Sequence, residues 1–310
     1  MRIDSIGNSA TDMNKNYRCG FVALVGRPNV GKSTLLNCIL GQKISITSKK
    51  PQTTRHRILG IKTSAQEQVI YVDTPGLHLG GDRAINRYMN REASGAIQDV
   101  DVIVFLVDRT KWTEEDENVL QKLQYLKTPV ILAINKTDQL EDKTQLLPHM
   151  ESLQQKMTFM NIVPISALKN EGVESLQKAV VDLLPVSTPF FPEEQVTDRS
   201  ERFFAAELIR EKLIRNLGQE IPHRLTVEIE SFVEEQNMYR INAIIWVEKP
   251  GQKGIVIGKN GSGLKVIGES ARKDMEKTFG CKVFLQMWVK VKKGWSNDER
   301  ALQSLGFKEV

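Results

Sequence analysis

The stretch that decides the fold is Gly26-Arg27-Pro28-Asn29-Val30-Gly31-Lys32-Ser33, which Thr34 follows directly. It fits the pattern G-x-x-x-x-G-K-[ST] and stands between an apolar run, residues 21–25, and a predicted helix, residues 34–40. In this arrangement the glycines let backbone N–H groups face phosphates, and the start of the helix adds positive potential. Lys32 is then expected at the β- and γ-phosphates of a nucleotide, and the Ser33 hydroxyl at a Mg²⁺ ion.

Short apolar runs recur on the C-terminal side of this stretch, at residues 69–72, 102–107, 130–134 and 162–164. They are rich in β-branched side chains and are separated by polar stretches of helical character. Buried parallel strands joined by crossover helices have this pattern. The sequence therefore predicts an α/β P-loop NTPase domain with a mostly parallel sheet flanked by helices.

Three further motifs follow predicted strands: Asp73-Thr74-Pro75-Gly76, Asn135-Lys136-Thr137-Asp138 and Ser166-Ala167-Leu168. Asp73 is expected to hold Mg²⁺, directly or through water, and the Gly76 N–H to meet the γ-phosphate. The Asp138 carboxylate can accept hydrogen bonds from guanine N1 and N2, whereas adenine would leave it unpaired. The Ala167 N–H is expected to address guanine O6. These motifs share the sheet edge where open α/β sheets bind ligands, and together they predict GTP or GDP as the nucleotide.

A polar stretch, Pro51-Gln52-Thr53-Thr54-Arg55, lies between the first two motifs. Thr54 is expected to close over Mg²⁺ and the γ-phosphate and to lose this contact after hydrolysis. It is preferred to Thr53 because it directly precedes Arg55, although an ordinary polar loop remains the alternative. GTP is expected to order residues 48–60 and 74–90. Arg55 and Arg57 are expected to be solvated, with a contact to RNA or to the other domain as the alternative.

The candidate catalytic residues are Lys32, Thr54, Gly76 and Asn29. Leu77 stands where Ras-like enzymes carry the glutamine that orients the attacking water, and leucine cannot do this. His78 is close by, but a lone histidine is more often structural. Slow intrinsic turnover is therefore expected. GTPases with asparagine at the position of Asn29 often resemble potassium-activated ones, so the participation of K⁺ is left open.

The length of 310 residues is typical of about two domains. Residues 1–18 are polar and are predicted to be a mobile extension, and residues 19–185 form the P-loop domain. Prolines and acidic residues crowd residues 186–198, the predicted linker. Residues 199–310 are predicted to form a smaller α+β domain, with a helix at 200–217, two alternating strands, a helix near 262–278 and a strand at 281–291.

A G-x-x-G tetrapeptide, Gly258-Lys259-Asn260-Gly261, stands between two apolar helical segments in this second domain. Its flanks, Val256-Ile257-Gly258 at its start and Leu264 and Ile267 after it, resemble a KH signature, whose loop backbone clamps about four nucleotides. The order helix, strand, strand, helix, helix, strand resembles the type II KH arrangement. Lys259 and Lys265 are expected at RNA phosphates. Bases are expected against an apolar groove lined by Ile255, Ile257 and Ile244.

Basic and aromatic residues interleave on the last predicted strand, where one face carries Lys282, Phe284, Gln286, Trp288, Lys290 and Lys292. Such a face suits single-stranded RNA, with rings that stack on bases and lysines that hold phosphates. The favoured alternative is that Phe284 and Trp288 pack under a helix while the lysines, including Lys282 and Lys290, are merely solvated. Both interpretations remain open.

The net charge is +5, but residues 249–293 alone carry +8 and the rest of the chain −3. A basic excess confined to one segment is typical of a nucleic-acid contact. No apolar run approaches the roughly 18 residues of a membrane span, the N-terminus lacks a signal-peptide core, and three cysteines suggest neither disulfides nor a zinc site. The chain is therefore expected to be cytoplasmic.

Taken together, GRPNVGKS, PQTTR, DTPG, NKTD, SAL and the G-x-x-G segment resemble the Era family of translation-factor-related P-loop GTPases, from about Cys19 to Val310. The resemblance implies GTP hydrolysis with Mg²⁺ and an RNA-binding KH domain that acts in maturation of the small (30S) ribosomal subunit. Its implied target is single-stranded RNA near the 3′ end of 16S rRNA. A monomer is expected, and a peripheral contact with the cytoplasmic face of the inner membrane is left open.

Two rival functions are weighed against this one. The first is a binding module whose GTPase is inert, which Leu77 makes plausible. The second is a GTPase whose C-terminal domain engages a membrane or a protein through the amphipathic residues 200–217. Glu201, Glu207 and Glu211 suit an anionic bilayer poorly.

Overall fold

The computed structural model describes residues 16–48, 50, 52–76, 83–218, 224–305 and 307. The chain divides into two compact units. The first comprises Met1–Gln42, Ile58–Thr74 and Gly95–Asp198, and the second Lys43–Arg57, Pro75–Ser94 and Arg199–Val310. Most of the predicted N-terminal extension lies outside the described residues, and its last residue, Arg18, already begins the first strand.

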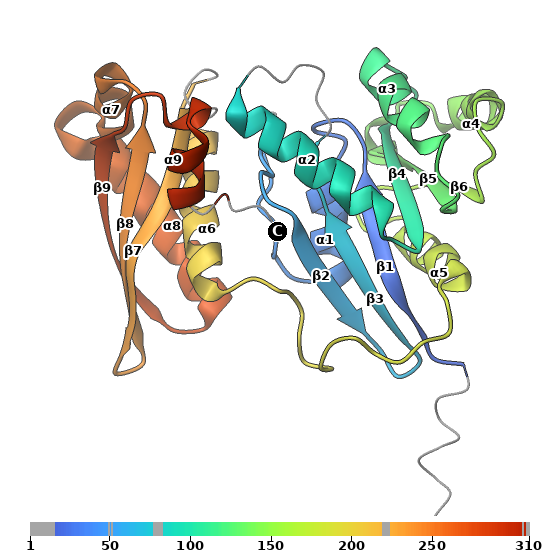
Figure 1. The fold of residues 1–310 in the computed structure, drawn as a ribbon, viewed down its shortest axis with the longest axis horizontal. Coiled ribbons are helices and arrows are strands. Elements are labelled where there is room, and N and C mark those ends of the chain that lie inside the picture. Colours follow the sequence, from blue (N-terminus) through green and yellow to red (C-terminus); the bar gives the residue numbers. More distant parts are fainter. Residues whose placement is uncertain are drawn as a thin grey trace, which may run out of the picture. The chain divides into compact units, whose positions relative to one another are not determined.

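The first unit is built on a six-stranded sheet of order β2-β3-β1-β4-β5-β6 (Figure 1). Its strands are β1 (Arg18–Val25), β2 (Ile58–Thr63), β3 (Glu67–Asp73), β4 (Val102–Asp108), β5 (Val130–Asn135) and β6 (Asn161–Pro164). All neighbours pair in parallel except β2, which is antiparallel to β3. The mostly parallel α/β sheet predicted from the sequence is confirmed.

Helices cover this sheet, and every residue of β4 and β5 is buried, as expected of strands covered on both faces. The helices are α1 (Lys32–Leu40), α3 (Glu114–Leu123), α4 (Leu146–Gln154) and α5 (Val173–Leu183), with short 3₁₀ turns at Thr137–Gln139 and Lys143–Gln145. Helices α1 and α5 contact each other and the strands. Thr113 and Asp116 form a capping box at the start of α3, which stabilises its first turn.

Two predicted loops are in part regular structure. Strand β2 occupies the end of the predicted 48–60 loop, and α2 (Ala84–Gln98) occupies much of the predicted 74–90 loop. The predicted linker also has partners in the first unit, because Ile61 N–H donates to the Val196 carbonyl and Leu59 N–H to the Asp198 carboxylate. Residues 186–198 are therefore hydrogen-bonded to the edge of the sheet.

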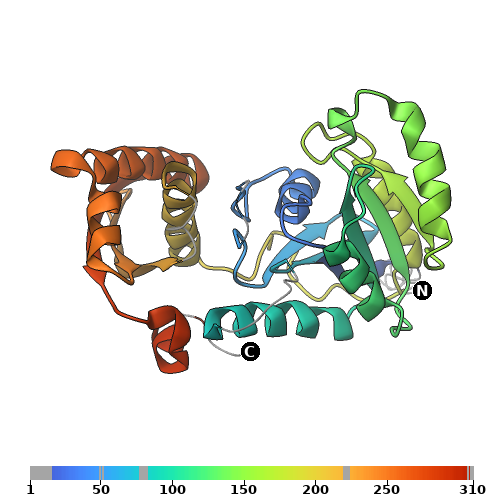
Figure 2. The ribbon, with the colours of Figure 1, turned by 90° about the horizontal axis from the view of Figure 1, so that it is seen from above.

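The second unit contains a three-stranded sheet of order β7-β8-β9 and three helices that pack on one of its faces (Figure 2). The chain order is α6 (Glu201–Asn216), β7 (Leu225–Glu235), β8 (Met238–Val247), α7 (Pro250–Ile257), α8 (Ser262–Phe279) and β9 (Lys282–Val291). Strands β7 and β8 are antiparallel, whereas β8 and β9 are parallel. This is the predicted α-β-β-α-α-β order of a type II KH domain.

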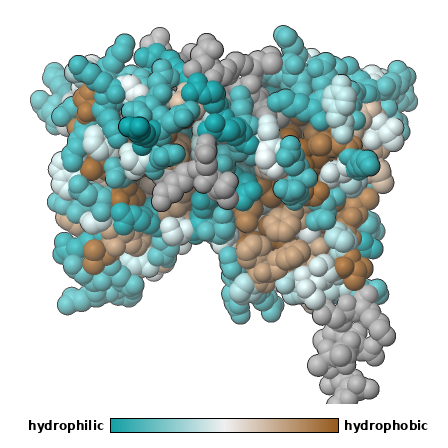
Figure 3. All heavy atoms as spheres, in the orientation of Figure 1, coloured by the Kyte–Doolittle hydropathy of each residue, from teal (hydrophilic) through white to brown (hydrophobic). Residues whose placement is uncertain are grey.

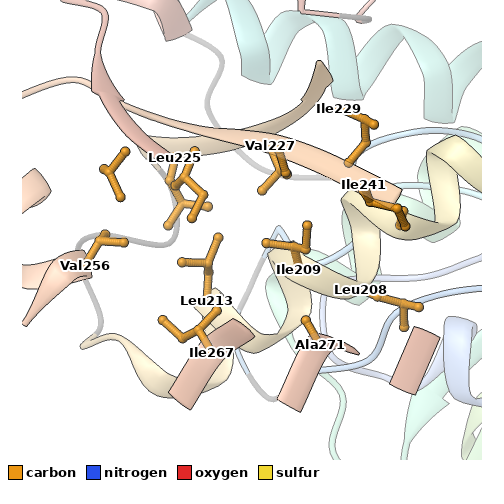
Figure 4. Close-up of a cluster of buried hydrophobic side chains, with 14 of the residues drawn as sticks. Leu208, Ile209, Leu213, Leu225, Val227, Ile229, Ile241, Val256, Ile267 and Ala271 are labelled. Atoms are coloured by element: carbon orange, nitrogen blue, oxygen red, sulfur yellow. The ribbon is translucent and has the colours of Figure 1, made fainter. Parts of the chain in front are cut away.

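The core of this sheet and its helices is continuous and apolar (Figure 4). It joins alternate residues of the strands to one stripe of each helix, for example Ile245 of β8, Leu213 of α6 and Ile267 of α8. The apolar residues that recur every second position in the strands and about every 3.6 positions in the helices therefore share one core, as the sequence pattern predicted.

A smaller cluster in the second unit joins the first residues of α2 to the C-terminal segment. That segment contains a 3₁₀ turn at Trp295–Asn297 and α9 (Glu299–Ser304). Trp295 is completely buried and lies in this cluster with Tyr88 of α2 and Phe307. The chain after β9 therefore stabilises the start of α2.

None of the helices in the described part of the chain has both the length and the apolar character needed to cross a membrane. The three cysteines are free. Cys19 is fully buried, whereas Cys38 and Cys281 are partly exposed.

Candidate nucleotide and RNA sites

The loop between β1 and α1 has the backbone that a phosphate cradle needs. Gly31 has φ 107°, and a Cβ there would lie 2.2 Å from Asn135 Nδ2, so another residue would be strained and would clash. Asn29 also has a left-handed backbone, with φ 63°. Helix α1 begins at Lys32 directly after this turn, which directs its N-terminal N–H groups at the loop.

Lys32 is almost completely buried beneath this loop. Its Nζ donates to the carbonyls of Gly26 at 2.8 Å and Arg27 at 3.0 Å. Burial lowers the pKa of Lys32 to about 8, and the attraction of Asp73 opposes this only in part. An ammonium group has three N–H donors, so this geometry leaves one for a phosphate oxygen.

The Ser33 hydroxyl donates to Asp73 Oδ2 at 2.7 Å, across the ends of α1 and β3. A hydroxyl and a buried carboxylate in direct contact are the hard oxygen ligands that Mg²⁺ prefers, so these residues fit the predicted ion. Thr54, Pro75 and Gly76 belong to the second unit, and their roles at the metal and the γ-phosphate remain predictions. Leu77 and His78 lie outside the described residues.

Asn135 joins the three predicted nucleotide loops of the first unit. Its Nδ2 donates to the Val30 carbonyl at 2.8 Å, while its Oδ1 accepts from the backbone N–H groups of Lys136 at 2.8 Å and Ala167 at 3.0 Å. The side chain is buried. In this structure the Ala167 N–H therefore has a protein acceptor, and its predicted contact with guanine O6 remains a prediction.

Asp138 is held by the next motif, because the Ser166 hydroxyl donates to its Oδ1 at 2.6 Å. Carboxylate oxygens have two acceptor sites each, so Asp138 can still accept from guanine N1 and N2. Thr137 is buried, with its hydroxyl bonded to the Ile165 carbonyl, and Leu168 is 69% exposed. The hydrogen bond from Ser166 thus fixes the orientation of the Asp138 carboxylate, and its contact with guanine remains a prediction.

Sequence reasoning missed two carboxylates near these loops. Asp108, at the end of β4, pairs with Lys136 at 2.8 Å and Arg109 at 2.7 Å. Burial raises the pKa of Asp108, but its hydrogen bonds to Arg109 and Lys136 outweigh this and hold the pKa below its usual value. The other carboxylate is Asp116, which binds Arg27 at 3.1 Å. The capping-box spacing of Thr113 and Asp116 was the available signal.

The G-x-x-G tetrapeptide forms a sharp turn between α7 and α8, as predicted. Gly258 has φ 71°, and a Cβ there would lie 2.8 Å from the Gly263 nitrogen, so the turn requires glycine. Lys259, Asn260 and Lys265 are exposed, Ile255 is 58% exposed, and Ile257 is half-buried. The structure thus brings an exposed backbone turn, two cations and an apolar side chain together.

The groove prediction is wrong for Ile244. Core residues of β8 are Ile241, Ala243 and Ile245, so Ile244 points to the face away from the helices, where it is opposite Trp288. Phe284 and Trp288 are also on this outer face, with 41% and 43% of their surface exposed. The favoured interpretation that these rings pack under a helix is therefore wrong. Lys282 and Lys290 are exposed beside them.

Residues 43–57 pack along α6 within the second unit. The Glu211 carboxylate, fully buried, accepts from Lys43 Nζ at 2.5 Å, from Thr47 N–H at 3.0 Å and from Arg215 at 2.9 Å. Arg210 donates to the Thr53 carbonyl and pairs with buried Glu207. The polar side of α6 is therefore covered, so the helix lacks the free amphipathic face that the rival membrane or protein contact would need.

Arg55 is 1% exposed and donates to the Leu225 carbonyl at 2.7 Å, so the expectation of a solvated side chain is wrong. The neighbouring His56 lies among Tyr88, Phe203 and Phe307, with its ring stacked on Phe307 at a centroid distance of 4.7 Å. The segment that carries Thr54 is thus anchored on both sides, by α6 and by this aromatic cluster.

The buried P-loop lysine, the Ser33–Asp73 pair and the oriented Asp138 carboxylate are the arrangement typical of GTP-binding P-loop proteins. A type II KH fold follows on the same chain. Two family models match the chain: a model described as a 50S ribosome-binding GTPase over residues 21–136, and the KH domain over residues 220–296.

Relatives that match over nearly the whole chain show which family it belongs to. GTPase Era of Pseudomonas aeruginosa strain LESB58 is 58% identical over 96% of this chain and 98% of its own length. GTPase Era of Ectopseudomonas mendocina is 60% identical over 94% of this chain and 97% of its own. The chain belongs to the Era family of GTPases and is a GTP-hydrolysing enzyme.

Two solved Era structures match at a TM-score of 0.92 and 38% identity, and each match covers 94% of this chain and 100% of the other. One is a variant of Aquifex aeolicus Era bound to GDP·AlF4−. The other is Era in complex with MgGDPNP and nucleotides 1506–1542 of 16S ribosomal RNA. Guanine nucleotide and Mg²⁺ therefore have counterparts in structurally similar proteins.

Proposed function

We propose that this GTPase is an assembly factor of the small (30S) ribosomal subunit, which holds single-stranded RNA near the 3′ end of 16S rRNA under control of its nucleotide. The observation that carries the proposal is the glycine turn of Gly258 and Gly261 between α7 and α8, on the same chain as a guanine site. The relative in complex with a 16S rRNA fragment supports this choice of RNA.

The turn suits RNA for steric and electrostatic reasons. With no Cβ at Gly258 or Gly261, a phosphate can approach the backbone closely, while Lys259 and Lys265 supply positive charge at the surface. Ile255 offers an apolar side chain to a base. KH domains use this combination to clamp about four nucleotides of a single strand.

Control by the nucleotide would run through the segments that carry Thr54 and Gly76. Residues 43–57 and 75–94 both cluster with the KH fold in the second unit, where Glu211 holds Thr47 and Phe307 packs on His56. We propose that Thr54 and Gly76 respond to the γ-phosphate and that their movement changes the KH fold that they pack against.

Hydrolysis is proposed to be slow without RNA. Lys32 and the P-loop N–H groups would stabilise charge on the phosphates, but Leu77 offers no group to orient water. Asn29, in its left-handed conformation within the P-loop, is the residue at which we place an activating K⁺. The ion would supply positive charge toward the phosphates.

One set of measurements tests this function. GTP turnover is measured in KCl and in NaCl, with and without a single-stranded RNA of the 16S 3′ end, and RNA affinity is measured with GDP and with a GTP analogue. We expect faster turnover in KCl and with RNA. Lys259→Glu should weaken RNA binding at least tenfold, whereas Lys178→Glu, an exposed charge reversal on α5, should not. No turnover under any of these conditions would favour a binding module with an inert GTPase.

A membrane contact through α6 is not supported by its surroundings. Glu207, Arg210 and Glu211 are buried within the second unit, so this helix does not present a free amphipathic face. If Lys259→Glu left RNA affinity intact, a protein or membrane partner for the KH fold would become the better explanation.

A further inference from the structure

The sheet of the KH fold has an outer face, opposite to α6, α7 and α8. Figure 1 views the sheet from this side, and Figure 3 shows hydrophilic atoms there with paler and brown side chains between them. Pairing of β8 with β9 places Arg240 opposite Phe284, Ile244 opposite Trp288 and Trp246 opposite Lys290. Cationic and aromatic side chains of β8 and β9 therefore lie side by side on this face.

The exposed part of this face follows β9. Every second residue of β9 points outward, in the order Lys282, Phe284, Gln286, Trp288, Lys290, and the strand contains no acidic residue. Phe284 and Trp288 keep 41% and 43% of their surface exposed. Alternate residues on a strand are about 6.6 Å apart, so rings and cations are spaced regularly.

The acidic residues named on the outer face belong to β7, and two of them pair with cations of β8 and β9. Lys290 is 3.9 Å from Glu230, Arg240 is 2.5 Å from Glu235, and the Trp246 indole donates to Glu228 at 2.7 Å. The carboxylates are thus on β7, and the outward residues of β9 are neutral or cationic, with the charge of Lys290 partly offset by Glu230. A polyanion that lies on this face is directed to β9.

The two exposed rings differ in their surroundings. The Arg240 guanidinium lies 5.2 Å from the centre of Phe284, which covers part of that ring. Among the described residues, no ring or cation stacks on Trp288. A large flat indole on a sheet face, flanked by lysines, is the arrangement by which RNA-recognition sheets stack single-stranded bases.

We propose that this face, along β9 and the neighbouring half of β8, is a second RNA surface on which bases stack on Trp288 and Phe284 while Lys282 and Lys290 hold phosphates. The inference rests on the proposed RNA-binding function and extends it. The turn stands at the start of α8, which packs on the inner face of β9, and β9 is the edge strand of the sheet. An RNA held by the Gly258–Gly261 turn would reach the outer face by crossing this edge.

The test compares two RNA lengths on the full chain. A strand of about four nucleotides fills only the glycine turn, whereas one of about twelve also reaches the outer face. Trp288→Ala should weaken binding of the longer RNA about five- to a hundredfold and leave the shorter one unchanged. Trp288→Phe should retain most of the affinity, and Lys290→Gln should reduce the salt slope of the longer RNA by about 0.7.

Matched controls are Val233→Ala, an exposed side chain on the β7 side of the sheet, and Tyr125→Ala, an exposed ring on the first unit. Both should leave the affinities for both RNA lengths unchanged. Quenching of tryptophan fluorescence by the longer RNA should be reduced in Trp288→Phe, which a merely structural role would not predict.

Equal affinity of wild type and Trp288→Ala for the longer RNA would overturn the second surface while leaving the proposed function intact. Equal weakening for both lengths would also overturn it, since the effect would then be structural. If wild type and Lys259→Glu bound both RNAs equally, the proposed function itself would fail.

Discussion

Asn135 Nδ2 donates a hydrogen bond of 2.8 Å to the carbonyl of Val30, and this bond connects the Asn135–Asp138 loop to the P-loop. The same side chain accepts the N–H groups of Lys136 and Ala167. A single buried amide therefore sets the spacing between the phosphate and guanine ends of the site. Its role differs from the one predicted for Asp138, which is a contact with the base itself.

Replacement of this amide should affect stability and binding together. Asn135→Ala leaves buried backbone groups unpaired, at about 1–3 kcal/mol each, so the melting temperature should fall by several degrees. Affinity for GTP and GDP should fall by similar factors, because the loops rather than the γ-phosphate are disturbed. Thermal melts and nucleotide titrations measure both quantities. Asn118→Ala removes an exposed hydrogen bond from the Asn118 side-chain amide to the Glu114 carbonyl. It is the control and should change neither stability nor nucleotide affinity.

A single substitution at Asp138 should change the preferred base from guanine to xanthine. In Asp138→Asn an N–H donor replaces one carboxylate oxygen, so it repels the guanine amino group and pairs with the carbonyl that xanthine carries at that position. GTP affinity should fall by about two to four orders of magnitude, from the loss of two charge-assisted hydrogen bonds, and XTP affinity should rise. Asp142→Asn, beyond the same 3₁₀ turn and bonded to Thr144, should leave both affinities unchanged. An unaltered preference for GTP would remove Asp138 from base recognition.

Nucleotide affinity should depend on the protonation of Lys32. Burial lowers the pKa of this amine to about 8 in the free protein, and bound phosphates should raise it again. Below pH 8 the ammonium is already present. Above pH 8 the free protein must take up a proton to bind, so affinity should fall as pH rises, up to about tenfold per unit. Titrations of GDP between about pH 7 and 9 measure this. Lys32→Gln should bind weakly and show a flatter profile, and a flat wild-type profile would contradict the prediction.

Much of this fold could be predicted because short stretches of sequence carry the pattern that identifies each strand and motif. Strands β4 and β5 are runs of apolar residues that a parallel sheet buries on both faces, and each nucleotide motif follows such a strand. Strand β2 was missed although Ile58, Leu59 and Ile61 are apolar and buried, because it directly follows the polar residues 51–57 and only a short apolar run marks it. It lies at the sheet edge, where its pairing with β3 is antiparallel. A segment beside a switch motif was therefore interpreted as part of the loop.

The packing of residues 43–57 had no local signal. Lys43 and Arg55 look like solvated cations in the sequence, yet their partners, Glu211 and the Leu225 carbonyl, lie more than 160 positions away along the chain. The same holds for β9, where alternation shows two faces but not which one the helices cover. In the structure Val283 and Val289 belong to the core, which leaves Phe284 and Trp288 outside.

Glu211 offers the sharpest test of this packing, because it holds Lys43, the Thr47 N–H and Arg215 while fully buried. Glu211→Ala removes the acceptor of three donors and leaves cations behind, so the free energy of unfolding should fall by about 3–5 kcal/mol. Where the variant stays folded, hydrogen exchange at Thr47 and its neighbours should accelerate while amides of β4 keep their protection. Glu235→Ala, whose pair with Arg240 is half-exposed, is the control and should cost about 1 kcal/mol or less. Unchanged exchange at Thr47 would show that α6 does not hold this segment in solution.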